Sequence, residues 1–255
     1  RLFGCKVKLH LHGTGLSATK SKVKSKLLKI MFSSCDLILL SKSLYSDVER
    51  FVELDKVTFI SNAVETPSIN ENKKSKNVSF LYVANLDARK GVFKALDVFR
   101  EYAKNEIGST LRIVGAGTVF LSEIDLANKI SSDYPEIAES VHVLGALYGE
   151  EKARAFISSD VFLYPTEHDA APLVVLEALS YALPVVCSNQ GALGDMVDHG
   201  KGGFVIDSFN VKSYVDAISI ILSKYKQFSN SARDAHLKEH SVSALSSKVK
   251  VLFHD

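Results

Sequence analysis

Cysteine is scarce in this chain of 255 residues: Cys5, Cys35 and Cys187 are widely separated and form no C-x-x-C pair. Their spacing indicates neither a disulfide framework nor a zinc site, so a reducing, cytoplasmic setting is predicted. Long apolar runs are missing too, because the longest, such as Asp160–Tyr164 and Pro172–Leu176, are far too short to span a bilayer. The first residues also lack the pattern of a signal peptide.

Several ligand-binding signatures are missing as well. The chain contains no Walker sequence and no D-x-D pair that could bridge a metal ion to a diphosphate. The segment Leu111–Val119 begins like a dinucleotide fingerprint, but Phe120 occupies the third glycine position. A tight turn between a strand and a helix is therefore the better interpretation. We predict no metal, no cofactor and no nucleic-acid partner.

The chain does contain enough apolar residues for a core, and its charge is uneven. Hydrophobic residues make up 46% of the sequence, enough for one large core or two smaller ones. Residues 1–76 carry 14 Lys and Arg against 7 Asp and Glu, whereas residues 77–255 carry 17 against 22. A basic front and an acidic back predict two modules with different partners.

Short apolar runs alternate with helical patterns along the chain, which predicts the α/β class. Apolar strand runs that are each followed by a helix are typical of a parallel sheet covered on both faces. We expect strands at Val7–Leu11, Asp36–Leu40, Val57–Ile60, Ser79–Ala84, Thr110–Val114, Val141–Leu144, Asp160–Tyr164, Pro184–Cys187 and Phe204–Ile206. We expect helices at Val23–Phe32, Leu44–Val52, Val92–Lys104, Val119–Ile130, Glu150–Ile157, Leu173–Tyr181, Val211–Tyr225, Ser229–Glu239 and Val242–Phe253.

A polar stretch at residues 66–77 has no periodicity and is interpreted as a linker between two domains. Residues 78–228 contain six strand candidates and are expected to form a complete domain. Residues 1–65 contain only about three, which is too few for a doubly wound domain, and the chain has no starting Met. We therefore expect an incomplete first domain, and helices at residues 229–255 that cross back to it.

The densest cluster of candidate site residues, T-E-H-D-A-A-P-L-V-V-L-E-A, joins a strand to a helix. Pro172 is favoured in the first turn of a helix, so the amides of Leu173 and Val174 are expected to face an anion such as a diphosphate. Glu177 can bind two vicinal hydroxyls of a ribose, and Asp169 those of a sugar ring. An ordinary strand–helix connection with solvated acids fits the motif about equally well.

A second cluster, F-L-Y-V-A-N-L-D-A-R-K-G-V, combines a strand, a loop and a helix that opens after Gly91. Lys90 lies at the carboxyl end of the strand, where open α/β sheets bind ligands, and its ammonium can hold a phosphate. Taken alone, a solvated lysine beside a glycine turn is the more common arrangement.

Two histidines lie near the start of the chain, in L-H-L-H-G-T-G. His10 and His12 are two residues apart on an expected strand and therefore point to the same face. No third ligand for a metal ion is evident. A structural role is favoured for His10, whereas His12, at the strand end, is the candidate for hydrogen bonding to a substrate.

A lysine-rich helix follows, with Val23, Leu27, Ile30 and Met31 on one face and lysines beside them. A helix that lies on an anionic membrane has this pattern, and so has a surface helix that packs its apolar face on its own sheet. The second interpretation is favoured.

Together and in this order, the clusters resemble the GT-B glycosyltransferases of family 4, and the resemblance covers nearly all of residues 7–253. The family typically shows H-G after a strand, a serine after a strand that opens with Asp, N-G-V before the linker, G-R-L-x-x-x-K-G, I-V-G-x-G and E-x7-E. The matching positions here are His12–Gly13, Ser41, Asn62–Val64, Ala84–Gly91, Ile113–Gly117, and Asp169 with Glu177. The string L-P-V-V, followed by Gly191 and Asp195, is also similar.

The resemblance implies two Rossmann-like domains with parallel sheets, the first incomplete, and a donor of the UDP or GDP type. It also implies roles for particular residues. These are Glu177 for the ribose; Lys90, Leu173 and Val174 for the diphosphate; the backbone from Leu144 to Leu147 for the base; and Asp169 with His12, from the opposite domain, for the donor sugar.

Two positions depart from the family pattern. Asn85 stands where the family has an Arg partner of the lysine, which removes a positive charge from the phosphate site. Whether the neighbouring Arg89 replaces that charge stays open. Asp169 stands in place of the first Glu and is one methylene shorter. Polysaccharide-type members often tolerate both changes, so we interpret the departures as the mark of a subtype.

The resemblance further implies a retaining hexosyltransferase that builds a surface polysaccharide, such as capsule or lipopolysaccharide, on a glycan or lipid-linked acceptor. Positioned cations and amides would stabilise the negative charge that grows on the leaving diphosphate, without a metal ion. The leaving phosphate could itself take the proton of the acceptor hydroxyl. The basic front module would bind the acceptor and contact the inner face of the plasma membrane.

Two alternatives stay open. A nucleotide-sugar epimerase shares the GT-B shape but forms its product without an acceptor. A truncated nucleotide-sugar-binding module would bind the donor and transfer nothing. Binding of UDP, GDP and their sugars, together with acceptor-dependent release of the nucleotide, distinguishes these possibilities.

Overall fold

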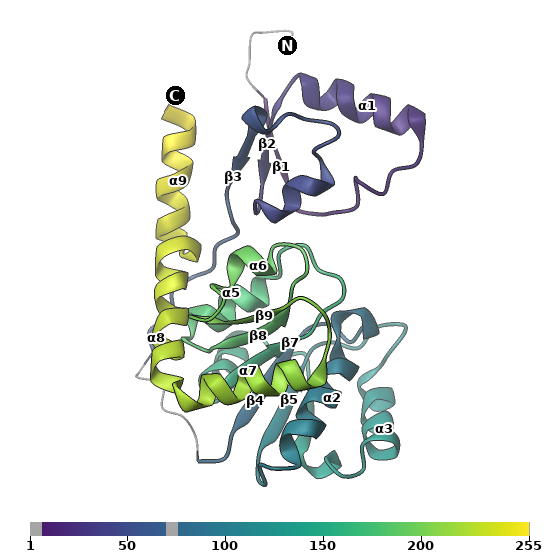
Figure 1. The fold of residues 1–255 in the computed structure, drawn as a ribbon, viewed down its shortest axis with the longest axis vertical. Helices are drawn as coiled ribbons and strands as arrows, with labels where there is room; N and C mark the ends of the chain where they lie inside the picture. The colour runs from purple at the N-terminus through teal and green to yellow at the C-terminus, as the bar shows by residue number, and fades with distance from the viewer. Residues whose placement is uncertain (1–6, 70–75, 255) are drawn as a thin grey trace.

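A computed structural model describes residues 7–69 and 76–254 and has an α/β architecture with two parallel sheets (Figure 1). The first sheet has the order β1-β2-β3, with β1 at Lys8–Leu11, β2 at Asp36–Leu39 and β3 at Val57–Phe59. The second has the order β6-β5-β4-β7-β8-β9. Its strands are β4 (Ser79–Val83), β5 (Thr110–Val114), β6 (Val141–Gly145), β7 (Val161–Tyr164), β8 (Val185–Ser188) and β9 (Gly203–Ile206).

The predicted α/β class is confirmed, and each expected strand coincides with an observed one to within one residue at either end. In the second sheet, the chain first builds outward from β4 to β6 and then restarts on the other side of β4 with β7. Every residue of β4 and of β7 is buried, as expected for central parallel strands covered on both faces. The direction in which successive strands are added therefore reverses between β4 and β7, and open α/β sheets bind ligands at the carboxyl ends of such a pair of strands.

The helices agree with the predicted pattern less closely than the strands. In the described residues they are α1 (Lys22–Ser33), α2 (Val92–Ala103), α3 (Glu123–Asp133), α4 (Gly149–Ile157), α5 (Leu173–Ser180), α6 (Leu193–Met196), α7 (Val211–Ser223), α8 (Tyr225–Ala235) and α9 (Val242–His254). The predicted start of α3 at Val119 is wrong. Ser122 and Asp125 form a capping box there, which satisfies the free amides of the first turn and begins the helix at Glu123.

The helix expected at Leu44–Val52 is also wrong, because only a 3-10 turn forms at Ser43–Asp47. The side chains of Leu44, Val48 and Phe51 are nevertheless buried. Three- and four-residue spacings bring side chains to one side in a tight turn as well as in a helix, so the spacing alone did not distinguish them.

The favoured interpretation of the lysine-rich helix is corrected by the exposure of its apolar residues. Val23, Leu27 and Ile30 of α1 are 71%, 60% and 58% exposed. Phe32 is buried and Leu28 packs on the core of the first sheet. The helix therefore faces its sheet with Leu28 and Phe32, and its wider apolar face points away from it.

The C-terminal helices run along one side of the molecule, from the second sheet to the level of the first (Figure 1). A π-helical turn at His236–His240 joins α8 to α9. The tail lies against the segment that connects the sheets: the Val64 amide donates to the His240 carbonyl at 3.0 Å, and Arg233 donates to the Pro67 carbonyl at 2.7 Å. None of the helices in the described ranges is long and apolar enough to cross a membrane.

Candidate functional site

A cavity of about 450 Å³ lies at the carboxyl ends of β4 and β7. Its wall comes from the loops after four strands of the second sheet and from the start of α5. Parallel strands end at one edge of a sheet, so loops far apart in the sequence meet there. The predicted site residues that line the cavity are Asn85, Lys90, Leu147, Asp169, Leu173 and Val174.

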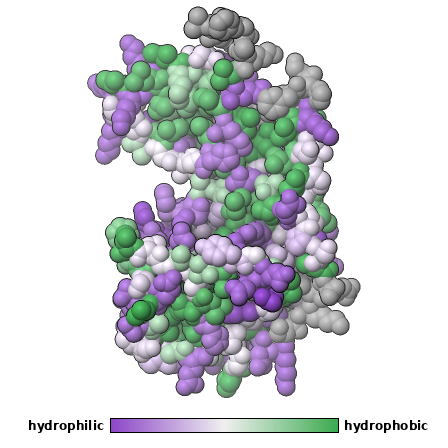
Figure 2. Space-filling view, turned by 180° about the vertical axis from the view of Figure 1, so that it is seen from behind, coloured by the Kyte–Doolittle hydropathy of each residue, from purple (hydrophilic) through white to green (hydrophobic). Residues whose placement is uncertain are grey.

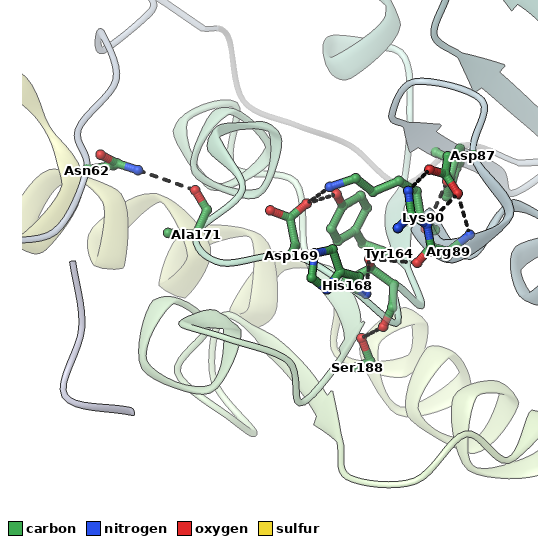
Figure 3. Close-up of polar contacts among 11 residues, drawn as sticks. Asn62, Asp87, Arg89, Lys90, Tyr164, His168, Asp169, Ala171 and Ser188 are labelled. Atoms are coloured by element: carbon green, nitrogen blue, oxygen red, sulfur yellow. Dashed lines mark hydrogen bonds and ion pairs between the residues drawn. The ribbon is translucent and has the colours of Figure 1, made fainter. Parts of the chain in front are cut away.

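Lys90 is positioned by a short turn between β4 and α2. The turn ends at Gly91, whose φ of 86° lies in the left-handed region, and a Cβ there would overlap the Pro165 carbonyl. The buried Tyr82 hydroxyl donates to the Lys90 carbonyl at 2.9 Å. The Lys90 Nζ atom lies 2.6 Å from Asp169 Oδ2, so the lysine reaches across from one loop to the next (Figure 3).

The Asp169 carboxylate has two hydrogen-bonding partners, and its backbone lies close to Gly191. Besides Lys90, the Tyr164 hydroxyl donates to its Oδ2 atom at 2.7 Å (Figure 3). Burial, and next the nearby Asp169 carboxylate, raise the pKa of Tyr164, so its phenol keeps its proton and acts as a donor. Gly191 lies beneath the loop with φ at 55°, and a Cβ there would overlap the backbone carbonyls of Asp169 and Ala170. The carboxylate is therefore presented to the cavity in one orientation.

Arg89 does not supply the charge that is missing at Asn85. Its guanidinium pairs with Asp87 at 2.7 Å, and its side chain is 66% exposed. Hydrogen bonds from Arg89 lower the pKa of Asp87 to about 2. Arg89 is not among the residues that line the cavity in the described part of the chain.

A second cation of the cavity was missed by the sequence analysis. Lys152, in the first turn of α4, lines the cavity, and its Nζ atom lies 2.8 Å from both carboxylate oxygens of Glu177. Glu177 projects from α5, one turn beyond Leu173. The sequence G-E-E-K-A-R looks like any solvated helix face, so nothing local distinguished Lys152 from the other lysines.

The start of α5 completes the wall. Pro172 precedes the helix and no side chain caps its first turn. The first amides of an α-helix have no partner within it and form its positive end, and Leu173 and Val174 both line the cavity. Two ammonium groups, the Asp169 carboxylate and a helix start therefore line one cavity, and the Glu177 carboxylate pairs with one of the ammonium groups. This set suits an anionic ligand with hydroxyl groups.

A second cavity, of about 250 Å³, lies between the two sheets and shares Asp169 with the first. It is lined from the first sheet by Thr14, Ser17 and Ser43, and from the second by His168 and Gly191, among others. The space-filling view shows a hollow between the upper and lower parts of the molecule (Figure 2). Asp169 therefore faces both the first cavity and the space between the sheets.

The two sheets are joined beside this second cavity. The Ser41 hydroxyl donates to Asp195 Oδ2 at 2.5 Å, and the Ser43 amide donates to the same oxygen at 3.0 Å. The Ser43 hydroxyl also donates to the Gly191 carbonyl at 2.8 Å. Asn62 donates to the Ala171 carbonyl at 3.3 Å, close to the start of α5 (Figure 3). Ser41 and Asp195 stood apart in the sequence, and only the fold pairs them.

Three predicted site residues lie outside the cavity lining. Glu177 is one of them, and it reaches the cavity only through its ion pair with Lys152. His12 directly follows β1, is exposed, and has its ring 4.1 Å from that of His10. Leu144 belongs to β6, and the first residue of that strand and its following loop to line the cavity is Ala146. Within residues 7–69 and 76–254, no three or more His, Cys, Asp or Glu side chains are placed to hold a metal ion.

Known proteins share both the sequence pattern and the fold. The sequence profile of the family described as "Glycosyl transferases group 1" matches residues 65–236. An uncharacterized glycosyltransferase of Haemophilus influenzae is 26% identical over 189 residues, which cover 72% of this chain and 51% of that protein. A UDP-Gal:alpha-D-GlcNAc-diphosphoundecaprenol alpha-1,3-galactosyltransferase of Escherichia coli is 26% identical over 239 residues, which cover 86% and 60%.

Among solved structures, HepE of Anabaena in complex with UDP superposes with a TM-score of 0.81 at 15% sequence identity, covering 98% of this chain and 72% of HepE. This likeness confirms the GT-B fold that the resemblance predicted. The chain spans about half the length of the curated relatives it matches. Because the family profile matches residues 65–236, well over half of the sequence, the chain belongs to the glycosyl transferases group 1 family.

Proposed function

We propose that this chain binds a UDP- or GDP-sugar and takes part in a retaining, metal-independent hexosyl transfer to a glycan or lipid-linked acceptor. One observation carries the proposal: Lys90, Asp169 and the start of α5 line a single cavity at the carboxyl ends of β4 and β7. A second carboxylate, that of Glu177, pairs with the lining residue Lys152. Cations and free amides suit a diphosphate, and carboxylates suit the hydroxyls of ribose and sugar.

In the proposed complex, each part of the donor meets a different part of the wall. The Lys90 ammonium and the amides of Leu173 and Val174 hold the diphosphate. Glu177 accepts the ribose hydroxyls. The remaining contacts are assigned to the backbone near Leu147 for the base, and to Asp169 for the donor sugar, with His12 approaching from the side of the first sheet.

The proposed reaction depends on stabilising the negative charge of the leaving phosphate more than on a general acid or base. As the bond between sugar and diphosphate breaks, negative charge grows on the leaving phosphate, where Lys90 and the α5 amides are already aimed. The acceptor would enter through the cavity between the sheets, which shares Asp169 with the donor cavity. Its hydroxyl proton would pass to the leaving phosphate, so the step would require no further base.

The relatives support the donor and acceptor classes. HepE was solved with UDP, and the E. coli relative is named for a UDP-sugar and a diphosphoundecaprenol-linked acceptor. We extend these two classes to the present chain, and the surface-polysaccharide role with them.

We also propose that the first sheet contacts the inner face of the membrane that carries such an acceptor. The exposed apolar face of α1 lies beside a basic cavity of about 680 Å³. Its charged lining residues are Lys20, Lys22, Lys26, Lys29 and Arg50. An amphipathic helix flanked by lysines suits an anionic lipid surface. Charge reversal of Lys22, Lys24 and Lys26 should abolish sedimentation with anionic vesicles, and retained binding would contradict this contact.

Calorimetry with UDP, GDP and their sugars tests the donor site. We expect one nucleoside diphosphate to bind the parent protein and Lys90→Met to weaken that binding about ten- to hundredfold, since a charge-assisted hydrogen bond is lost. With a lipid-linked glycan acceptor, nucleotide release should persist in EDTA, and NMR should show a product with the anomeric configuration of the donor. Absence of binding by every nucleotide tested would refute the proposal, and product formation without acceptor would indicate an epimerase.

A further inference from the structure

The cavity holds two ion pairs of the same kind. Lys90 pairs with Asp169 at 2.6 Å, and Lys152 pairs with Glu177 at 2.8 Å. The four side chains are similarly shielded, with exposed fractions between 17% and 29%. Lys152 lines the cavity, whereas Glu177 is not among the lining residues, so the lysine stands at the wall in front of the carboxylate.

The charges of this wall cancel when no ligand is bound. Asn85 is neutral, and Arg89 is turned away to Asp87. In the described part of the chain, Lys90 and Lys152 are the lysines and arginines that line the cavity. A nucleoside diphosphate brings at least two negative charges, more than one ammonium can balance. A lysine carries its charge on a flexible stem, so it can change partners without a backbone movement.

We infer that Lys152 is a second diphosphate-binding residue, and that donor binding exchanges the Lys152–Glu177 ion pair for a Lys152–phosphate contact. This inference rests on the proposed donor site and deepens it. The exchange releases the Glu177 carboxylate to accept the ribose hydroxyls. The exchange also makes up for the positive charge that is absent at Asn85. That charge then comes from Lys152 in α4 and not from the loop after β4.

The exchange has a consequence for small ligands. A nucleoside without phosphates offers no anion to Lys152, so it leaves the Lys152–Glu177 pair intact. The diphosphate therefore contributes to affinity twice, through its own contacts and by unmasking Glu177. A lysine that merely orients Glu177 would affect nucleoside and nucleoside diphosphate equally.

The test compares a nucleoside with its diphosphate on matched variants of the full chain. UDP and GDP are first titrated calorimetrically into the parent protein, and the one that binds is used with its nucleoside, the latter followed by ligand-detected NMR. Lys152→Gln removes the charge but keeps a donor for Glu177. We expect it to weaken diphosphate binding about ten- to hundredfold and nucleoside binding less than about threefold.

Lys94→Gln is the matched control. Lys94 pairs with Glu167 at 2.7 Å with 27% of its side chain exposed, nearly the same as Lys152 at 26%, but it does not line the cavity. We expect both of its affinities to equal those of the parent. Lys152→Arg, which keeps the charge, should retain most of the diphosphate affinity. If thermal unfolding shows that the glutamine variant is not folded, Lys152→Met, which also removes the charge, replaces it and carries the same expectation.

The outcomes separate this inference from the proposed function. If the parent binds a nucleoside diphosphate and Lys152→Gln binds it equally well, the inference is overturned and the donor site stands. Equal losses for nucleoside and diphosphate would reduce Lys152 to a positioning residue and overturn the exchange. If the parent binds no nucleotide at all, the proposed function fails and the inference fails with it.

Discussion

The two sheets differ in how completely their residues are buried. In the second, β4 and β7 are buried at every position, and one continuous core extends from β4 to α8. In the first, all three residues of β3 are only partly buried, and much of the apolar surface of α1 is exposed. The difference indicates that the second sheet and its helices carry their own stability together with the cavity at the ends of β4 and β7. The first sheet depends more on its contacts with the second.

The largest loss of stability should follow a cavity made in the core around the second sheet. Phe162 in β7 is fully buried and its ring packs beside Phe156 and Tyr164. Phe162→Ala should lower the free energy of unfolding by about 3–5 kcal/mol, measured by urea denaturation, because the rigid surroundings cannot fill the space. Phe51→Ala in the small first core should cost less. An equal or larger loss at Phe51 would contradict the contrast between the sheets.

A smaller effect should follow loss of the contact between the sheets. Asp195→Ala removes the carboxylate that accepts hydrogen bonds from the buried Ser41 hydroxyl and from the Ser43 amide, and leaves these serines their contacts with each other. We expect a cost of about 1–3 kcal/mol, with faster hydrogen exchange in β2 and unchanged nucleotide binding. Asp198→Ala is the control, because the Asp198 side chain is about half exposed and forms a surface ion pair with Lys201. Unchanged exchange in β2 of the Asp195 variant would show that the contact does not hold the first sheet.

Acid should remove the stabilising contribution of the Asp195 carboxylate. Burial alone would raise the pKa of Asp195, but hydrogen bonds from Ser41 and Ser43 outweigh it, and the pKa is lowered from 3.8. A carboxyl with a lowered pKa stabilises the fold above its unfolded pKa and loses that contribution as the pH falls through the folded value. The stability difference between the parent and Asp195→Ala should therefore be full at about pH 6 and shrink below about pH 4. A difference that stays constant down to about pH 3 would refute this assignment.

The smallest effect should come from the exposed face of α1. Leu27 is 60% exposed, so Leu27→Ser should change the free energy of unfolding by no more than about 0.5 kcal/mol. Leu28→Ser, one residue along, faces the core of the first sheet and should cost clearly more. Urea denaturation of the pair measures the difference. Equal costs would show that the exposed face is covered in solution.

Much of the fold and part of the site could be predicted from residue patterns. Strand runs without polar alternation located the strands, because burial on both faces leaves a local mark on the sequence. Helix limits were harder, since a capping box at Ser122 and tight turns after Ser43 decided them. Lys90, Asp169 and the start of α5 were recognisable because they follow strand ends, where parallel sheets bind ligands.

What the sequence determined by itself is therefore the class of the fold, the place of each strand and several of the loops that line the cavity, all of which depend on neighbours a few residues apart. Only the tertiary structure decided the partners: Lys90 with Asp169, Lys152 with Glu177, and Ser41 with Asp195. It also turned Arg89 outward and left one face of α1 uncovered. Those outcomes depend on strand order and on which sheet edges meet, and residues that are distant along the chain leave no local pattern that reveals their contact.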